Sequence, residues 1–282
     1  MKKIVVLYHN QCWDGFGGAW VAWKKFKDSA EYIGVEHDAP VPKGLKNKEI
    51  YLIDFCYSRQ EMIKLEKNNF KVVVLDHHIT KKAETEMMKD HLFSNNHSGS
   101  YLAWQYFFSG KKVPNLILYI QDNDLWKFRI KGSKEIMLSV NLFPYSFDVW
   151  DKICNQLKTS KGKREYFIQG RAIYNYVQML SKEIGNSANK VVLSGIKAWA
   201  VNAPRFIRSE LGNLLTKKTK GINVGIVWYM ENNGDVQVSL RSNGKIDVSK
   251  LAQKFKGGGH EKASGFIFRS KLKDKFPWKI IE

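Results

Sequence analysis

The sequence predicts an α/β protein in which a mostly parallel, doubly wound sheet is followed by a smaller α/β domain. Two observations support this fold class. Over the first 125 residues short apolar segments alternate with helical patterns, and from Lys190 onward the sequence is rich in strand-like segments. Strands that alternate with helices are typical of right-handed βαβ units and a parallel sheet. The length of 282 residues accommodates two domains, and 44% hydrophobic with 26% charged residues excludes a disordered chain.

The elements follow from the spacing of the apolar residues, since short apolar runs predict strands and spacings of three and four predict helices. The first domain is predicted to have strands at Ile4–Tyr8, Glu31–Gly34, Glu49–Ile53 and Val72–Leu75, and helices at Gly17–Phe26 and Arg59–Asn68. A helical middle follows at Tyr101–Phe108, Asn115–Ile120, Lys134–Leu142 and from Arg164 to Ser187. The last part is predicted to have strands at Val191–Leu193, Ala198–Asn202, Asn223–Tyr229, Val236–Arg241 and Gly265–Arg269, and a helix at Val248–Phe255.

These elements predict three segments. They are a first domain with a helical extension at residues 1–160, a connecting helix at 161–189 and a second domain at 190–282. The active site is expected in the cleft between the two domains.

The positive charge of the chain is concentrated in its second half. The formal net charge is +19, and residues 151–282 carry 25 Lys and Arg against 10 Asp and Glu. A focused positive field attracts polyanions such as nucleic acid, polyphosphate or an acidic membrane surface. The alternative is a Lys-rich surface that is merely solvated.

The cysteines and the apolar runs indicate a compartment. The three cysteines are an odd number, the chain opens directly with the strand-like Ile4–Tyr8 rather than a signal peptide, and no apolar run approaches the roughly 20 residues of a membrane-spanning helix. We therefore expect a soluble, reduced, cytoplasmic protein that does not enter a membrane.

Acidic and histidine residues follow the predicted strands of the first domain. In open α/β sheets ligands bind outside the carboxyl ends of the strands. Carboxylate oxygens suit hard divalent ions, and imidazole shifts the preference toward Mn²⁺, Co²⁺ or Fe²⁺. The predicted metal ligands at this rim are His9, Asp14, Asp54, His77 and Asp122.

These residues lie in motifs that resemble the DHH phosphoesterase superfamily. This superfamily includes RecJ-type exonucleases, nano-RNases, cyclic-dinucleotide phosphodiesterases, exopolyphosphatases and manganese pyrophosphatases. The second half resembles the DHH-associated domain, which carries the substrate-binding motifs. The matching segments are His9–Gly15, Ile53-Asp54, Asp76-His77-His78 and Ile120–Asp122, followed by Ser239–Ser242, Asp247–Ser249 and Gly257–Phe266.

The resemblance implies a role for each residue of the first four motifs. It implies one or two Mn²⁺ ions, with Mg²⁺ or Co²⁺ as alternatives, and Asp54 as the ligand that bridges two metals. Asp76 is then an orienting residue and His78 faces the substrate. Asp124 is the alternative to Asp122. We prefer Asp122 because it follows the apolar pair Tyr119-Ile120 more closely.

One residue departs from the family pattern. The first motif of the family usually contains Asp-x-Asp, and here Cys12 stands where the first aspartate is expected. Cys12 is either a softer metal ligand or a small buried residue beside the site. Trp13 and Trp126 also adjoin metal motifs, where a base could stack, although a Trp is more often core or pocket wall.

The predicted substrate-binding residues are in the second domain. Three consecutive glycines can bring backbone N–H groups close to an oxyanion, and the guanidinium of Arg241 can grip a phosphate. The alternative for the glycines is a flexible turn. The set is Arg241, Gly257, Gly258, Gly259 and His260.

The sequence therefore predicts a metal-dependent phosphodiesterase or exonuclease that hydrolyses short oligonucleotides or single-stranded nucleic acid. An exopolyphosphatase or pyrophosphatase would use the same metals on a phosphoanhydride. A nucleic-acid-binding protein with weakened catalysis is the third alternative.

Overall fold

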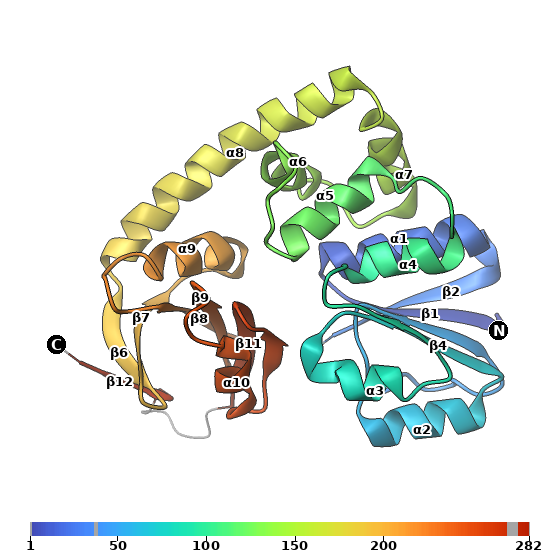
Figure 1. The fold of residues 1–282 in the computed structure, drawn as a ribbon, viewed down its shortest axis with the longest axis horizontal. Helices are drawn as coiled ribbons and strands as arrows, with labels where there is room; N and C mark the ends of the chain where they lie inside the picture. The colour runs from blue at the N-terminus through green and yellow to red at the C-terminus, as the bar shows by residue number, and fades with distance from the viewer. Residues whose placement is uncertain (1, 37–38, 270–275, 282) are drawn as a thin grey trace. The chain divides into compact units, whose positions relative to one another are not determined.

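The computed structural model describes residues 2–36, 39–269 and 276–281. The chain divides into two compact units, unit 1 at residues 1–173 and unit 2 at residues 174–282. Each unit has its own sheet and its own hydrophobic core (Figure 1).

Unit 1 is built on a five-stranded parallel sheet with the order β2-β1-β3-β4-β5. The chain passes from β1 to β2 on one side and then returns to β3 on the other, so the topological switch point lies between β1 and β3. Ligands bind at such a point in doubly wound sheets. The strands are β1 (Ile4–His9), β2 (Ala30–Val35), β3 (Glu49–Ile53), β4 (Lys71–Asp76) and β5 (Asp90–Phe93).

Helices cover both faces of this sheet because successive strand residues point to opposite faces. Val6 and Ile53 belong to one core, with side chains of α1 and α4, whereas Val5 and Leu52 belong to a second core, with side chains of α2. Figure 1 shows α1 and α4 side by side on one face and α2 and α3 on the other. These helices are α1 (Trp13–Phe26), α2 (Arg59–Asn68), α3 (Lys82–Glu86) and α4 (Gly99–Phe107).

Further helices extend the core of α1 and α4. α5 contributes Leu116 and Ile120 to it, and α7 contributes Trp150 and Ile153. The 27-residue α8 begins in unit 1 and ends in unit 2. The bounds are α5 (Asn115–Asp124), α6 (Ser133–Val140), α7 (Phe147–Gln156) and α8 (Ser160–Asn186).

Unit 2 is built on a seven-stranded mixed sheet with the order β10-β11-β9-β8-β7-β6-β12. Among its described residues, β7 and β8 pair in parallel and the other neighbours are antiparallel. The strands are β6 (Asn189–Leu193), β7 (Ile196–Asn202), β8 (Val224–Met230), β9 (Val236–Ser242), β10 (Gly258–His260), β11 (Ala263–Phe268) and β12 (Trp278–Ile280), and the helices are α9 (Arg208–Leu215) and α10 (Val248–Gln253).

The predicted fold class is confirmed, since a parallel, doubly wound sheet is followed by a second α/β unit. The predicted segment boundaries and the site in a cleft between the domains stay predictions. Among the described residues, no helix combines the length and the apolar character needed to cross a bilayer.

Candidate metal centre and phosphate-binding residues

The carboxyl ends of β1, β3 and β4 bring polar residues to one edge of the unit 1 sheet. His9 ends β1, Asp54 follows β3 and Asp76 ends β4. Asp54 has a φ of +67°, a left-handed backbone that Asp adopts more readily than most residues. The chain therefore turns sharply at Asp54, whose Oδ2 lies 3.4 Å from Nδ1 of His9.

His77 lies among three carboxylates. Its Nε2 atom is 3.1 Å from Asp54 Oδ1, 3.5 Å from Asp124 Oδ2 and 3.6 Å from Asp14 Oδ2. Burial would lower the pKa of His77, but the negative charges of Asp124, Asp54 and Asp14 outweigh it and raise the pKa to about 10. The three carboxylates therefore attract a cation to the place where this imidazole lies.

Asp14 shows why the carboxylates need a cation. It is fully buried in the first turn of α1, and its carboxylate accepts hydrogen bonds from the backbone N–H groups of Gly99, at 2.5 Å, and Ser100, at 3.0 Å. Burial, followed by the charges of Asp54 and Asp124, nevertheless raises its pKa to about 8. Two helix N–H groups do not balance the negative charge that is collected here.

The donor atoms of this cluster fit a divalent cation. The Oδ2 atoms of Asp76 and Asp124 are buried and accept no hydrogen bond from the described residues. Carboxylate oxygens and imidazoles in this number are the ligands of Mg²⁺ and Mn²⁺ sites. Among the described residues of unit 1, the donor atoms within each of three sets lie within 4.8 Å of one another: Asp14, His77 and Asp124; His9, Cys12 and Asp54; and Asp54, Asp76 and His78.

Asp76 and His78 form a pair beside these atoms. Oδ1 of Asp76 accepts hydrogen bonds from the backbone N–H groups of His77, at 2.7 Å, and His78, at 3.2 Å, and it lies 2.8 Å from Nδ1 of His78. Burial opposes the charged imidazole, but the carboxylate of Asp76 raises the pKa of His78. Asp76 therefore fixes the tautomer and the orientation of the His78 ring.

Cys12 immediately precedes α1, and its side chain does not cap the helix. Burial raises the pKa of the thiol well above its usual value, and the charges of Asp54, Asp124 and Asp14 raise it further. The thiol is therefore neutral unless a cation replaces its proton. The structure brings Cys12 to the predicted cluster.

The fourth motif requires a correction. The preference for Asp122 assumed a residue that leaves an element directly, but α5 continues to Asp124, and residues two apart on a helix point about 200° away from each other. The carboxylate of Asp122 accepts hydrogen bonds from the N–H groups of Arg129 and Ile130 and from the hydroxyl of Ser133. Asp124, the alternative, is the residue that reaches His77.

Arg241 is the arginine of the predicted phosphate-binding set, and its side chain is partly buried. Its guanidinium donates to the carbonyl of Leu240 and to Ser209 Oγ, both at 2.9 Å, and its buried Nε has no hydrogen-bond partner among the described residues. Burial, with the charge of Arg208, lowers its pKa to about 9. A Cβ at Gly212 would lie 2.7 Å from Arg241 Cγ, so this glycine admits the arginine beside α9.

The glycine segment is ordered differently from the predicted loop. Gly258, Gly259 and His260 form the short strand β10, which pairs with β11. The N–H group of Gly257 donates to the carbonyl of Ala252, so this donor cannot bind an oxyanion. Gly259 has a φ of +129°, which favours glycine, and the three glycines therefore permit a tight strand rather than three free donors.

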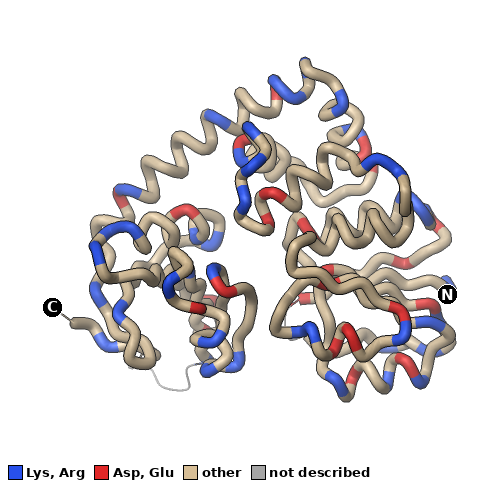
Figure 2. Tube along the Cα trace, in the orientation of Figure 1, with Lys and Arg blue, Asp and Glu red and all other residues tan. Residues whose placement is uncertain are grey.

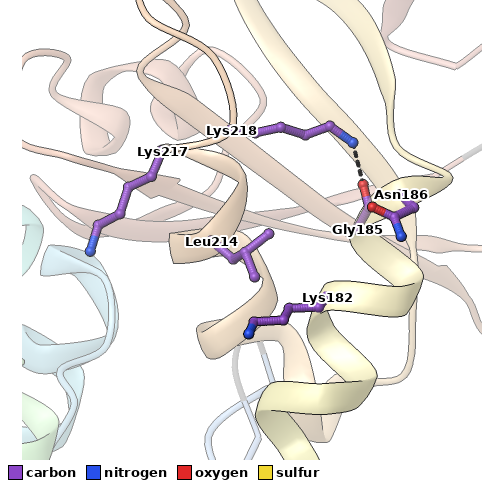
Figure 3. A pocket seen from close by; sticks show the side chains of 6 residues that line it. All are labelled: Lys182, Gly185, Asn186, Leu214, Lys217 and Lys218. Carbon is purple, nitrogen blue, oxygen red and sulfur yellow. Dashed lines mark hydrogen bonds between the residues drawn. The ribbon is translucent and has the colours of Figure 1, made fainter.

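A second cationic feature of unit 2 lies between the ends of α8 and α9. Figure 3 shows Lys182, Lys217 and Lys218 around a hollow of about 520 Å³. Lys218 Nζ donates to the carbonyl of Gly185 at 2.5 Å, whereas Lys182 and Lys217 form no ion pair with a carboxylate in the described part of the chain. Lys and Arg also recur along α8 (Figure 2).

Residues 169–277 match the family model of the DHHA1 domain. This match follows a unit that presents Asp76-His77-His78 at the carboxyl edge of a parallel sheet. The chain therefore resembles the DHH phosphoesterases, through this motif and through the match of residues 169–277 to the DHHA1 domain.

Two curated proteins are similar to this chain over most of its length. An uncharacterized protein of Acanthamoeba polyphaga mimivirus is 29% identical over 301 residues, which cover 99% of this chain and 70% of the viral protein. A 3′,5′-cyclic-nucleotide phosphodiesterase of Helicobacter pylori is 23% identical over 249 residues, which cover 72% of this chain and 69% of that protein.

Solved structures of the same fold cover nearly the whole chain. An exopolyphosphatase-related protein of Bacteroides fragilis has a TM-score of 0.53 at 13% identity, covering 96% of this chain and 88% of that one. RecJ of Thermus thermophilus in complex with Mn²⁺ has a TM-score of 0.51 at 14% identity, covering 95% of this chain and 50% of that one.

Sequence reasoning missed Gly99 and Ser100, which contribute backbone N–H groups rather than side chains to this candidate site. A Cβ on residue 99 would lie 2.8 Å from Asp54 Cβ, so glycine is required there. The Ser98-Gly99 pair at the start of a helical pattern was the available signal, because Ser98 caps α4.

Proposed function

We propose that this protein is a DHH-type, metal-dependent phosphodiesterase that hydrolyses short oligonucleotides or single-stranded nucleic acid. The observation that carries the proposal is the group of three carboxylates around His77, of which Asp14 and Asp54 are buried and Asp124 is partly exposed. A divalent cation would neutralise the charges of these carboxylates, and the same cation would neutralise the phosphate groups of a nucleic acid.

The proposed ion is Mn²⁺, with Mg²⁺ or Co²⁺ as alternatives, in one or two positions. A bound divalent ion lowers the pKa of a water molecule toward neutrality and stabilises charge on phosphoryl oxygens. The proposed ligands are His9, Cys12, Asp14, Asp54, His77 and Asp124, with Asp124 in place of Asp122.

We assign Asp76 and His78 to proton handling at the scissile bond. In hydrolysis the oxygen of water bonds to phosphorus, the bond to the leaving oxygen breaks, and that oxygen takes up a proton. Because Asp76 holds Nδ1 of His78 at 2.8 Å, the opposite nitrogen of the ring is the one that can reach a substrate. His78 is the proposed donor of that proton and Asp76 its positioning residue.

Unit 2 is proposed to bind the phosphates of the substrate. Arg241 is a partly buried cation whose Nε has no hydrogen-bond partner among the described residues, and a planar guanidinium binds phosphate oxygens through two hydrogen bonds. Gly258, Gly259 and His260 lie on β10 and remain proposed contacts. The similarity to a cyclic-nucleotide phosphodiesterase supports a phosphodiester substrate.

A substrate panel tests the proposal. The full chain with Mn²⁺ is given short RNA, short DNA, cyclic dinucleotides, pyrophosphate and polyphosphate, with Asp54→Asn as the matched control, and the products are separated chromatographically. Release of nucleoside monophosphates by the wild type alone supports a phosphodiesterase. Release of phosphate from polyphosphate alone would instead indicate a phosphoanhydride hydrolase, and binding without turnover a nucleic-acid-binding protein. The cytoplasmic location stays a prediction.

A further inference from the structure

Two aromatic residues in the loop between α5 and α6 have an unusual backbone. Trp126 has a φ of +54° and Phe128 a φ of +46°. A left-handed conformation is uncommon for any residue other than glycine, and for a bulky side chain it is an outlier. Such strain persists where the surrounding structure enforces it, and it is concentrated at functional sites.

Asp122 enforces this conformation. Its carbonyl accepts hydrogen bonds from the N–H groups of Lys127, at 2.9 Å, and Phe128, at 3.3 Å. Its carboxylate accepts hydrogen bonds from the N–H groups of Arg129, at 2.8 Å, and Ile130, at 3.1 Å. One fully engaged aspartate therefore determines the course of the loop that carries both aromatic residues.

The two rings do not serve the hydrophobic core. Neither belongs to a core cluster of the described residues, although both are large and only partly buried. They pack edge to face with their centroids 4.6 Å apart, and the ammonium of Lys134 lies 5.1 Å from the Trp126 ring and 4.5 Å from the Phe128 ring. An aromatic surface and a cation are thus held next to each other outside the core.

The loop begins at the carboxylate cluster. Asp124 approaches His77 within 3.5 Å, and Trp126 is two residues further along the chain. Two residues span at most about 7 Å, so the Trp126 backbone lies within that distance of a cluster residue. The base of a nucleotide is separated from its phosphate by one sugar, so it can reach a surface at this distance.

We propose that Trp126 and Phe128 form a platform on which a nucleobase of the substrate stacks, with Asp122 as its positioning residue. The inference rests on the proposed function in one respect, namely that the substrate is a nucleotide. Stacking is tolerant of sequence because every base has a π face. The platform would therefore select nucleotides over polyphosphate without selecting one base.

Equilibrium binding tests the platform without requiring turnover. The dissociation constants of adenosine 5′-monophosphate and ribose 5-phosphate are measured by calorimetry with Mn²⁺ present, for the wild type, Trp126→Leu and Phe128→Leu. We expect the wild type to bind the nucleotide about tenfold more tightly than the sugar phosphate. Each Leu variant should reduce this preference and leave the affinity for ribose 5-phosphate unchanged.

The controls separate stacking from folding. Trp126→Phe keeps a ring and should keep most of the preference, while Phe70→Leu removes an exposed aromatic side chain elsewhere and should change nothing. Asp122→Asn should reduce the preference without changing the thermal shift that Mn²⁺ produces. Equal affinity of the wild type for both ligands, or equal losses for both in Trp126→Leu, would overturn the platform. Failure of the proposed function would appear separately, as no hydrolysis of a dinucleotide.

Discussion

Asp14 in the carboxylate cluster of unit 1 and Arg241 of unit 2 carry charges of opposite sign, and the surroundings of each disfavour its charged form. Burial and neighbouring carboxylates raise the pKa of Asp14 to about 8, and burial with Arg208 lowers the pKa of Arg241 to about 9. A protein gains no stability from a buried charge without a counter-charge. We infer that each region is built for a ligand of the opposite charge, a cation in unit 1 and an anion in unit 2.

The largest expected effect comes from removing a carboxylate of the cluster. Asp54→Asn and Asp124→Asn should each lower Mn²⁺-dependent hydrolysis by more than about 100-fold, beyond the usual cost of losing an outer-shell partner. They should also abolish the rise in Tm that Mn²⁺ gives the wild type. Asp122→Asn is the matched control and should keep that rise. If Mn²⁺ raises the Tm of Asp124→Asn but not that of Asp122→Asn, then Asp122 and not Asp124 is the metal ligand.

Arg241→Gln tests the anion-binding side of the comparison. Charge-assisted hydrogen bonds contribute about 1.5–3 kcal/mol, so KM should rise roughly 10- to 100-fold with a smaller change in kcat. The Tm should not fall, because a partly buried cation beside Arg208 is removed. Arg171→Gln removes the same charge from an ion pair with Glu135 and should leave KM unchanged. A lower Tm with an unchanged KM would make Arg241 a structural residue.

Cys12 sharpens the description of the cation site. If its thiolate binds metal, Cys12→Ser should weaken Mn²⁺ binding about tenfold, because a neutral hydroxyl is a poor ligand. Cys12→Asp adds a carboxylate to the cluster, so the Tm of the metal-free variant should be lower than that of the wild type. Mn²⁺ should then raise the Tm of this variant by more than it raises that of the wild type. Titrations of Mn²⁺ followed by thermal melting measure both effects. If Cys12→Ser leaves Mn²⁺ binding unchanged, and Mn²⁺ does not restore the Tm that Cys12→Asp loses, Cys12 is a small packed residue and not a metal ligand.

The lysines around the hollow in Figure 3 should contribute a smaller and salt-dependent effect. Replacing Lys182 and Lys217 with Ala should make oligonucleotide binding less sensitive to salt. The slope of log K against log salt concentration should become shallower by about 0.7 for each lost phosphate contact. Binding isotherms at several salt concentrations measure this slope. The control is Lys161→Ala, since Lys161 is exposed and lies 4.0 Å from Glu165. An unchanged slope would mean that the hollow is only a solvated surface.

The smallest expected effect concerns Asp247, a motif residue that caps α10 by accepting hydrogen bonds from the N–H groups of Ser249 and Lys250. Asp247→Ala should cost about 1 kcal/mol of stability at neutral pH. These contacts lower the pKa of Asp247, so the charged cap contributes above the unfolded pKa near 4 and is lost as pH falls through the lower folded value. Denaturation at pH 7 and pH 2 measures the difference, and Asp247→Asn, a neutral cap, is the control.

The sequence was sufficient for four of the five strands of the unit 1 sheet and for several residues at its edge, whereas the edge strand β5 was not predicted. Parallel strands bring the residues at their carboxyl ends to a common rim, so His9, Asp54 and His77 could be expected together. The choice between Asp122 and Asp124 required knowledge of where α5 ends. Both residues lie on this helix, and their positions around the helix axis decide which carboxylate reaches the cluster. Boundaries of this kind vary by two or more residues in any sequence pattern.

Other features could not be read from residue types. Gly99 acts through its N–H group and its missing Cβ, and the glycines after Ala252 proved to be a paired strand. Both depend on which backbone groups are already bonded, and this is a property of the assembled fold. The same limit applies to β12, which pairs with β6 from far along the chain.

The hydrogen bond from the Gly99 amide to the Asp14 carboxylate makes one backbone group a reporter of the metal centre. At 2.5 Å this charge-assisted contact should shift the amide proton far downfield in a proton–nitrogen correlation spectrum. Protonation of Asp14, or its engagement by a diamagnetic ion such as Mg²⁺, changes the charge that the amide faces. A single resonance would then follow occupancy of the site in solution, with no substrate, product or label present.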